Sequence, residues 1–211
     1  MTASRVVHVV DDDEAIRRSV SFLLRTSGYI AVTYATGAAF LAAVAAAEFG
    51  CVLLDVRMPD IDGLEVQRRL AERGIAMPVV VLTGHGDLSV GIRAMKAGAV
   101  DFLQKPFEKA ILLDAILAAF NRLDDAAGRA ADAETAICVV AGLTTRERTV
   151  LGAMASGLPN KTIAFDLGIS ARTVEVHRAN VMTKLGVRSL SGALRIAFAA
   201  GLGDVAARET T

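Results

Sequence analysis

The chain has 211 residues, of which 53% are hydrophobic and 22% charged, enough for one large or two ordinary packed domains. The two cysteines are too few for a disulfide framework, and their spacing is not that of metal ligands. We find neither the pattern of a signal peptide nor a run of the ~20 apolar residues that span a bilayer, so we expect a cytoplasmic protein. The formal net charge is zero, but basic residues outnumber acidic ones nine to five from Leu143 onward, so only this second part is expected to meet a polyanion.

Residues 5–123 alternate between apolar runs and amphipathic segments. The apolar runs, at 5–10, 29–34, 51–55, 78–83 and 99–104, are typical of buried strands. The amphipathic segments, at 14–27, 37–47, 63–73, 87–97 and 108–123, have helical spacing. Five strand–helix repeats predict an α/β fold with a five-stranded parallel sheet and helices on both faces. Right-handed crossovers favour the strand order 2-1-3-4-5 in such a unit.

Residues 124–142 form a break in this pattern. They are small and polar, at best weakly helical, and we predict that they are a linker. We assign no role to the short apolar patch Ile137–Val140. The prediction is therefore a first domain at 1–123, a linker at 124–142 and a second domain at 143–211.

The second domain is predicted to be small and all-α. Helices are expected from about 145 to 156 and at 160–167, 171–185 and 189–200. Thr144 or Thr145 can cap the first helix, and Glu147 has the spacing of a capping-box partner for Thr144. A short helix, a glycine-containing turn and a longer capped helix are the pattern of a helix-turn-helix.

Acidic side chains gather where the predicted strands end. Asp11 and Asp12 follow the first strand and Asp55 ends the third, and these strands are neighbours in the order 2-1-3-4-5. Clustered carboxylates repel one another and need a cation, and hard oxygen ligands with open positions suit Mg²⁺. With the metal bound, an ionised Asp55 can attack a phosphoryl group in line. An aspartate that starts a turn is the simpler interpretation for one such residue, but not for three together.

Two further polar residues end the neighbouring strands. Thr83 ends the fourth strand, and its hydroxyl would donate to a phosphoryl oxygen, while Lys105 follows the fifth and would pair with such oxygens. Each has a structural alternative, since a threonine at a strand end is usually structural and Lys105-Pro106 could be an ordinary turn. The joint spacing of all five residues favours a phosphoryl-transfer site.

These residues resemble a known family. The pair Asp11-Asp12, Asp55 with Met-Pro-Asp after it, Thr83-Gly84 and Lys105-Pro106 stand where the receiver domain of bacterial two-component response regulators has them. The resemblance covers residues 5–121 and implies a flavodoxin-like (βα)5 fold. It also implies that a sensor histidine kinase phosphorylates Asp55.

The same resemblance implies a metal site and a switch. Asp12 and Asp55 would ligate Mg²⁺ directly, together with the backbone carbonyl of Arg57, and Asp11 would act through water. The Lys-Pro peptide of the family is commonly cis. Phe102 holds the position of the aromatic switch residue, which turns inward when the threonine moves toward the phosphate.

Helix 171–185 is the second candidate site. Its polar side chains are Arg172, Thr173, Glu175, His177, Arg178, Asn180 and Lys184, and Val174, Val176, Val181 and Leu185 lie between them. An apolar seam backed by basic and polar residues suits a helix in the major groove of DNA. The alternative, a solvated face of a helical bundle, explains the charges but neither the paired short helix nor the local excess of basic residues.

Residues 143–200 resemble the LuxR-type (NarL-type) DNA-binding domain. The matching runs are 143–148, 157–164 and 169–185, and those at 173–180 and 83–87 resemble the FixJ subgroup in particular. The resemblance implies double-stranded promoter DNA as a partner. It would place Asn160, Lys161, Thr173, Arg178 and Lys184 on phosphates, and Glu175, Val176 and Ala179 against base edges. Glu175, where many relatives have lysine, would accept from a cytosine amino group or pair with Arg172 or Arg178.

We therefore predict a phosphorylation-controlled transcription factor. Because one helix-turn-helix reads few base pairs, we expect phosphorylation to cause homodimerisation, through residues 87–104 with Ile92, Lys96, Asp101 and Gln104 as contacts. Ordinary surface at Ile92, and release of an inhibitory contact between the domains, are the alternatives. RNA polymerase is a further candidate partner.

Two other functions compete with this prediction. An aspartyl-phosphate phosphatase also uses a strand-end aspartate as nucleophile, but it needs a second acid two residues later, where this chain has Arg57, so we expect no enzyme. A DNA-binding regulator that works without phosphorylation is the other candidate. The full set of five receiver residues argues against it.

Overall fold

A computed structural model describes residues 5–84, 88–124 and 129–203. The chain divides into two compact units, residues 1–126 and 127–211. The predicted helix start at residue 87 and residues 125–128 of the predicted linker lie outside the described residues. In the described part, no helix combines the length and apolar character that a membrane crossing requires.

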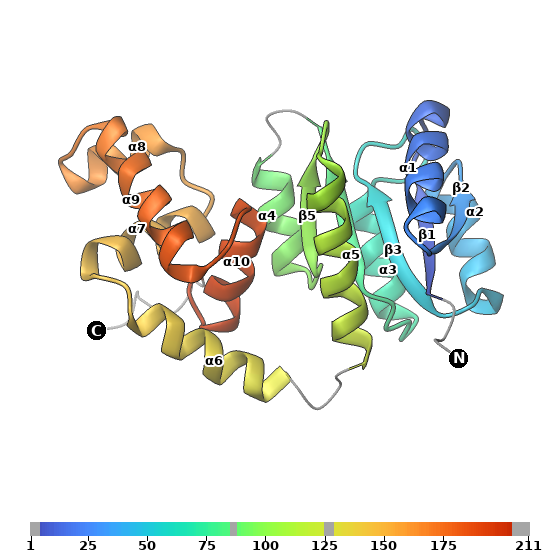
Figure 1. Cartoon of the computed structure of the whole chain (residues 1–211). Coiled ribbons are helices and arrows are strands. Elements are labelled where there is room, and N and C mark those ends of the chain that lie inside the picture. Colours follow the sequence, from blue (N-terminus) through green and yellow to red (C-terminus); the bar gives the residue numbers. More distant parts are fainter. Residues whose placement is uncertain (1–4, 85–87, 125–128, 204–211) are drawn as a thin grey trace. The chain divides into compact units, whose positions relative to one another are not determined.

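The first unit is a parallel sheet covered by helices on both faces (Figure 1). Its strands are β1 (Val6–Val10), β2 (Ile30–Tyr34), β3 (Gly50–Asp55), β4 (Val79–Thr83) and β5 (Asp101–Gln104). Its helices are α1 (Glu14–Thr26), α2 (Gly37–Ala43) with the 3-10 turn η1 (Val44–Ala46), α3 (Gly63–Glu72), α4 (Leu88–Lys96) and α5 (Lys109–Asp124). The strands pair in parallel in the order β2-β1-β3-β4-β5, which confirms the predicted fold class and topology.

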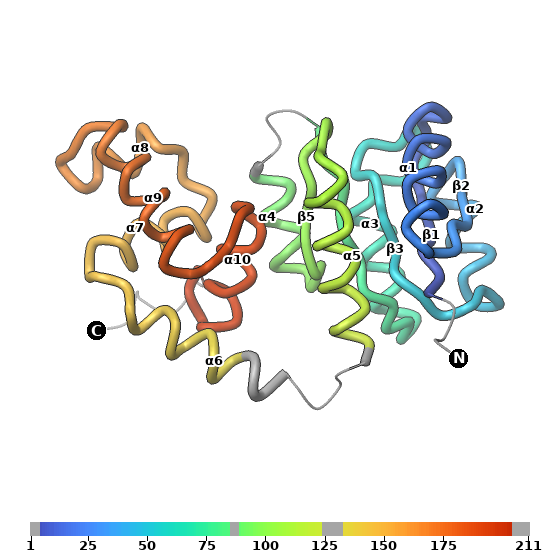
Figure 2. The backbone as a smooth tube through the Cα atoms, in the orientation of Figure 1, coloured from blue at the N-terminus to red at the C-terminus, as the bar shows by residue number. Residues whose placement is uncertain are grey.

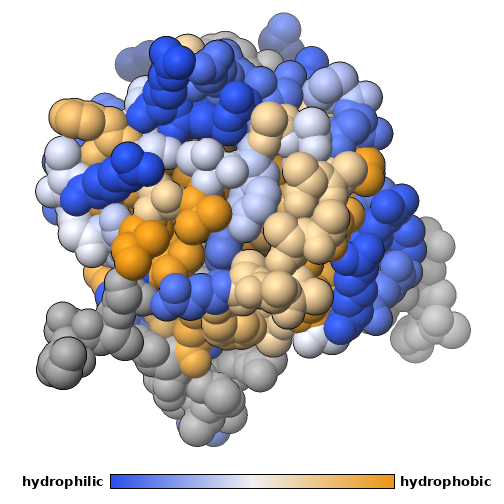
Figure 3. Space-filling model, turned by 90° about the vertical axis from the view of Figure 1, so that its right-hand side faces the viewer, coloured by the Kyte–Doolittle hydropathy of each residue, from blue (hydrophilic) through white to orange (hydrophobic). Residues whose placement is uncertain are grey.

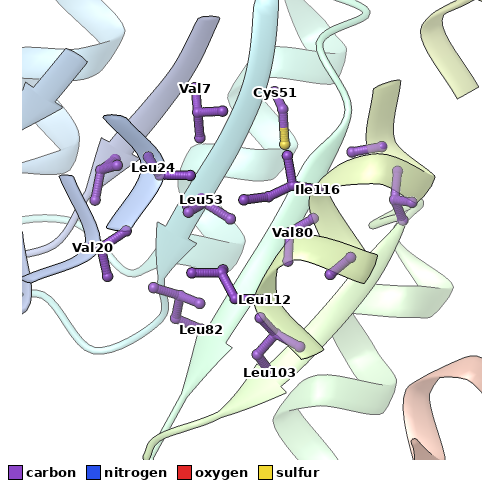
Figure 4. Close-up of a cluster of buried hydrophobic side chains, with 14 of the residues drawn as sticks. Val7, Val20, Leu24, Cys51, Leu53, Val80, Leu82, Leu103, Leu112 and Ile116 are labelled. Atoms are coloured by element: carbon purple, nitrogen blue, oxygen red, sulfur yellow. The ribbon is translucent and has the colours of Figure 1, made fainter. Parts of the chain in front are cut away.

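The core lies on both faces of the three central strands. β1, β3 and β4 are buried along their whole length, as wholly apolar runs predict. Alternate side chains point to opposite faces, and one set packs beneath α1 and α5 (Figure 4). On the opposite face, the His8 ring lies beside that of Phe40 on α2, and the Phe102 ring lies against Gly91 of α4.

β2 is one edge of the sheet. It leaves the apolar side chains of Ile30 and Val32 exposed, and Figure 3 shows apolar patches among polar ones on the side of the unit that carries β2 and α2. Its sequence contains neither a charged residue nor a proline, which protect many edge strands from pairing with other chains.

The second unit is helical (Figure 2). α6 (Arg129–Ala141), α7 (Thr145–Ala155), α8 (Asn160–Leu167), α9 (Ala171–Leu185) and α10 (Leu190–Ala199) are joined by short turns. The predicted capping box forms at the start of α7 between Thr144 and Glu147. α8 and α9 end at Gly168 and Gly186 with φ of 63° and 66°, a conformation that favours glycine. The helix-turn-helix predicted from residue 160 onward is therefore present.

The predicted linker requires a correction, because residues 129–141 form α6. Its buried positions include Ala136 and Val140, one helical turn apart, and the helix packs against α10. Ile137 of the same patch is exposed. Small residues give this segment a weak apolar face, so its helix depends on packing against α10 rather than on a pattern that the sequence displays.

The predicted dimer face also requires a correction. Ile92 is 4% exposed and belongs to the core of the first unit, because it shares the inward face of α4 with Met95. Asp101 is also buried, and its Oδ1 accepts a hydrogen bond from the Phe102 N–H at 2.7 Å. Lys96 and Gln104 are exposed. A polar substitution at Ile92 would therefore disturb folding before it could disturb dimerisation.

Candidate phosphorylation site and nucleic-acid interface

The carboxyl ends of the central strands bring the predicted acidic cluster together. Register pairs Val10 of β1 with Leu54 of β3, so Asp11 and Asp55 leave the sheet side by side. The ligand atoms of Asp11, Asp12 and Asp55 lie within 4.8 Å of one another. Asp11 and Asp55 are buried and Asp12 is exposed, so the cluster opens to solvent on one side.

Lys105 holds the two buried carboxylates. Its Nζ lies 2.6 Å from Asp11 Oδ2 and 2.9 Å from Asp55 Oδ1. The Lys105–Pro106 peptide is cis, as the receiver resemblance implies. Burial of like charges this close together requires a cation, and the ammonium group supplies one.

Ionisation at this site is set by burial and by the ion pairs together. Burial raises the pKa of Asp55, and the bond from Lys105 opposes that rise without cancelling it. Burial lowers the pKa of Lys105, but its bonds to Asp11 and Asp55 outweigh burial and the pKa is raised. The ammonium is therefore charged at neutral pH, and Asp55 is a carboxylate that burial leaves less stable than an exposed one.

The loop between β3 and α3 is held tightly beside this cluster. Asp60 Oδ2 accepts from the Ala38 N–H at 2.9 Å, which ties the loop to α2. At Gly63 a Cβ would lie 2.2 Å from the Asp55 carbonyl oxygen, so a glycine is needed where α3 approaches the strand end. Arg57, whose carbonyl was predicted as a metal ligand, lies in this loop. Sequence reasoning missed Asp60, although its place after Met58-Pro59 was part of the motif.

Thr83 ends β4, directly after the residue that pairs with Asp55, and Phe102 lies on the neighbouring strand β5. Thr83 is buried, and its hydroxyl makes a long hydrogen bond of 3.5 Å to the Leu103 carbonyl. Phe102 is buried with its ring over α4, where a Cβ at Gly91 would lie 2.5 Å from the ring. Because Gly91 has no side chain, the Phe102 ring can pack against α4 in this buried position.

α9 has one buried face and one exposed face. Val174, Val181 and Leu185 are buried against the rest of the second unit. Of the predicted DNA contacts, the exposed ones are Lys161, Thr173, Glu175, Val176, Ala179 and Lys184, and Val176 is 54% exposed.

Three of the predicted DNA contacts, including the exposed Lys184, make polar contacts within the protein. Arg178 Nη1 donates to Asn160 Oδ1, which connects α9 to α8. Burial lowers the pKa of Arg178, and the nearby Glu175 charge offsets part of this effect. Lys184 Nζ lies 2.7 Å from Glu147 Oε2 on α7, a contact that sequence reasoning did not predict.

Comparisons with known proteins match both parts of the chain. Residues 7–117 match the response regulator receiver domain, and residues 141–197 match the bacterial regulatory proteins of the luxR family. The chain belongs to the response regulators with a luxR-family DNA-binding domain. It is 49% identical over 203 residues to the transcriptional regulatory protein FixJ of Azorhizobium caulinodans, with 96% of each chain covered. It is 46% identical to FixJ of Rhizobium meliloti, with 93% of this chain and 97% of that one covered.

Solved structures give the same result for this response regulator. Full-length FixJ from B. japonicum is 44% identical, with a TM-score of 0.58 and coverage of 95% of this chain and 98% of that one. The response regulator StyR is 40% identical, with a TM-score of 0.56 and coverage of 93% and 99%. This family regulates transcription in response to phosphorylation, so the phosphatase alternative loses its support.

We expect the Asp55→Asn variant to be more stable than the wild type at neutral pH in metal-free buffer. Because burial raises the pKa of Asp55 above the ordinary value near ~3.9, the native state binds this proton more tightly than the unfolded chain. Ionisation of Asp55 therefore costs stability as the pH rises through its native pKa. The amide removes that cost, so the advantage of the variant should shrink as the pH falls toward ~4.

Thermal unfolding in the presence of a chelator at several pH values measures this effect. Asp114→Asn, on an exposed position of α5, is the matched control and should leave the unfolding midpoint unchanged. A wild type that is more stable than Asp55→Asn at neutral pH would show that the Lys105 bond outweighs the cost of burial.

Proposed function

We propose that a sensor histidine kinase phosphorylates this response regulator on Asp55 in the cytoplasm, and that phosphorylation controls the binding of α9 to promoter DNA. The observation that carries this proposal is the cluster of Asp11, Asp12 and Asp55 at the carboxyl ends of the strands, where Lys105 pairs with Asp11 and Asp55. Strand-end carboxylates at a topological switch point are positioned to bind and react with a ligand.

The carboxylates of this edge fit Mg²⁺. Asp12 and Asp55 would hold the ion directly with the Arg57 carbonyl, and Asp11 would act through a water molecule. When bound, the ion offsets the negative charge of the phosphoryl group. Asp12 is exposed, so one side of this ligand set is accessible from solvent.

The protein's own groups have distinct roles in the transfer. An Asp55 oxygen attacks the phosphorus of a phosphohistidine in line, the P–N bond breaks, and the imidazole leaves with the electron pair. The Lys105 ammonium, already 2.9 Å from Asp55, then pairs with a phosphoryl oxygen. The Thr83 hydroxyl leaves its long bond to Leu103 and donates to another phosphoryl oxygen. Phe102 follows Thr83 as the switch residue that alters the surface of α4 and β5.

The chemistry at Asp55 has a direct test. Asp55→Asn should abolish labelling by acetyl phosphate with Mg²⁺, because an amide is not a nucleophile, and a chelator should do nearly the same to the wild type. Asp12→Asn should weaken Mg²⁺ binding, so labelling should be slower and should require a higher Mg²⁺ concentration. Mass spectrometry of the intact protein measures the phosphorylated fraction.

Asp13→Asn is the matched control for these variants. Asp13 is adjacent in sequence and exposed, and asparagine preserves its cap on α1, so labelling should stay at the wild-type rate. If Asp55→Asn is labelled at the wild-type rate, the phosphoacceptor has been assigned to the wrong residue.

We place α9 in the major groove of the promoter. Glu175, Val176 and Ala179, on its exposed face, would contact base edges. Lys161 and Thr173 would contact phosphates from the ends of α8 and α9. Asn160 and Arg178 would do so as a bonded pair, since the guanidinium keeps further N–H donors for a phosphate.

Phosphate and base contacts should respond differently to mutation. Lys161→Ala should weaken binding to every duplex and reduce the slope of log K against log salt by ~0.9, because one phosphate contact releases its counterion. Val176→Ala should change the preference among sequences and leave that slope intact. Fluorescence anisotropy at several salt concentrations measures both quantities.

Arg195→Ala on the exposed side of α10 is the control for a lost positive charge, and it should leave the salt slope unchanged. Should Val176→Ala flatten the slope while Lys161→Ala changes sequence preference, the roles of the two helices are reversed.

Dimerisation would connect the two sites. We propose that the phosphorylated protein dimerises through the exposed residues of α4 and β5, including Lys96 and Gln104, and that Ile92 and Asp101 support this surface from within. Two linked copies bind paired half-sites more tightly than one copy. Release of an inhibitory contact between the two units remains the alternative mechanism.

The dimer proposal predicts that Lys96→Glu lowers the dimer fraction of the phosphorylated protein, because charge reversal at an interface is unfavourable. Sedimentation velocity on phosphorylated samples measures that fraction. Arg25→Glu on the exposed side of α1 is the control and should dimerise normally. A phosphorylated wild type that stays monomeric would support release of an inhibitory contact instead.

A further inference from the structure

Glu147 is a buried carboxylate at the start of α7. It is 4% exposed, and its Oε2 accepts from the Thr144 N–H at 2.8 Å and from the Thr144 hydroxyl at 2.9 Å. The third partner is the Lys184 ammonium, at 2.7 Å, from the last turn of α9. The Lys184 bond, followed by the Thr144 N–H, holds the pKa of Glu147 at about 2, so the carboxylate is ionised whenever DNA binding can be measured.

The pair belongs to a set of polar bonds that connects the three helices around the predicted interface. Lys184 and Glu147 connect α9 to α7, and Arg178 and Asn160 connect α9 to α8. Arg146 Nη2 donates to the Leu167 carbonyl at 2.7 Å, which connects α7 to the end of α8. Each pair of helices is therefore joined by a directional bond in addition to its apolar contacts.

Directional bonds can define the position of α9 along its axis, which the apolar contacts of its buried face do not. Apolar contacts stabilise a helix against its neighbours but are non-directional. An ion pair at the last turn fixes the axial position of α9, and this position decides which base pairs its exposed residues can reach. The Lys184 side chain keeps 43% of its surface exposed while it is paired. A phosphate that drew Lys184 away from Glu147 would leave a buried carboxylate without its cation, which is unfavourable.

We propose that Lys184 is a positioning residue rather than a phosphate contact, and that its ion pair with buried Glu147 sets the reading position of the recognition helix α9. The inference rests on the proposed DNA-binding function and specifies how the helix is held for it. It reverses the assignment that the sequence resemblance gave to Lys184.

Four variants isolate the pair. Glu147→Gln keeps the capping box, since glutamine serves at that position, and removes the charge. Lys184→Met removes the ammonium and keeps the length of the side chain, and the double variant removes both charges. Lys184→Arg is the conservative variant that should restore the pair. Lys161→Met is the matched control, an exposed lysine that is proposed to contact a phosphate.

The probes are a duplex selected by the wild-type protein from a random pool and an unrelated duplex of equal length. We expect Glu147→Gln and Lys184→Met each to lose about tenfold in affinity for the selected duplex, the change that the loss of one charge-assisted bond represents. For both variants, the affinity for the unrelated duplex and the salt slopes on the two duplexes should stay at the wild-type values. The double variant should be no weaker than Lys184→Met, and Lys184→Arg should approach the wild type. Lys161→Met should lose ~0.9 of salt slope on both duplexes.

Three results would overturn the inference. A loss of ~0.9 in salt slope for Lys184→Met on both duplexes would make Lys184 a phosphate contact. Unchanged affinity of Glu147→Gln for the selected duplex would show that the pair positions nothing, and circular dichroism confirms that this variant is folded. A wild type that selects no duplex from the pool would instead refute the proposed DNA-binding function itself.

Discussion

The parallel pairing of β1 with β3 is the constraint on which the phosphorylation site depends. Two aspartates separated by more than forty residues in the sequence become neighbours because the carboxyl ends of their strands lie side by side. The buried ends of these strands place both carboxylates in a poorly solvated position, where they repel each other. Lys105 follows β5, which is separated from β3 by β4, and its ion pairs with both carboxylates offset this repulsion.

Both units contain a buried carboxylate held by a lysine, but the two carboxylates differ in how well they are satisfied. Glu147 has a hydrogen-bonding backbone N–H, a hydroxyl and an ammonium, and its pKa is low. Asp55 has Lys105 and a raised pKa. A fully bonded carboxylate is suited to hold a structure in place, whereas an incompletely compensated one is suited to exchange its partner for a phosphoryl group and a metal ion.

The features predictable from sequence were those that one segment carries by itself. Apolar runs ending in Asp55 or Thr83 predicted buried strands with polar ends, and the spacing of Thr144 and Glu147 predicted a helix cap. The errors concern residues whose environment is made by distant segments. The burial of Ile92 depends on how α4 turns against the sheet, and the partner of Lys184 lies 37 positions away on another helix. The helix at 129–141 forms on α10, which follows it by about fifty residues.

Because residues 129–141 form a helix, the linker between the two units is shorter than the sequence predicted. The sequence suggested nineteen residues between the domains, but four separate the end of α5 at Asp124 from the start of α6 at Arg129. Five peptide steps span at most ~17 Å when fully extended. If two receivers pair, each DNA-binding unit stays within this chain length of its own receiver, so the two DNA-binding units have a high effective concentration for each other.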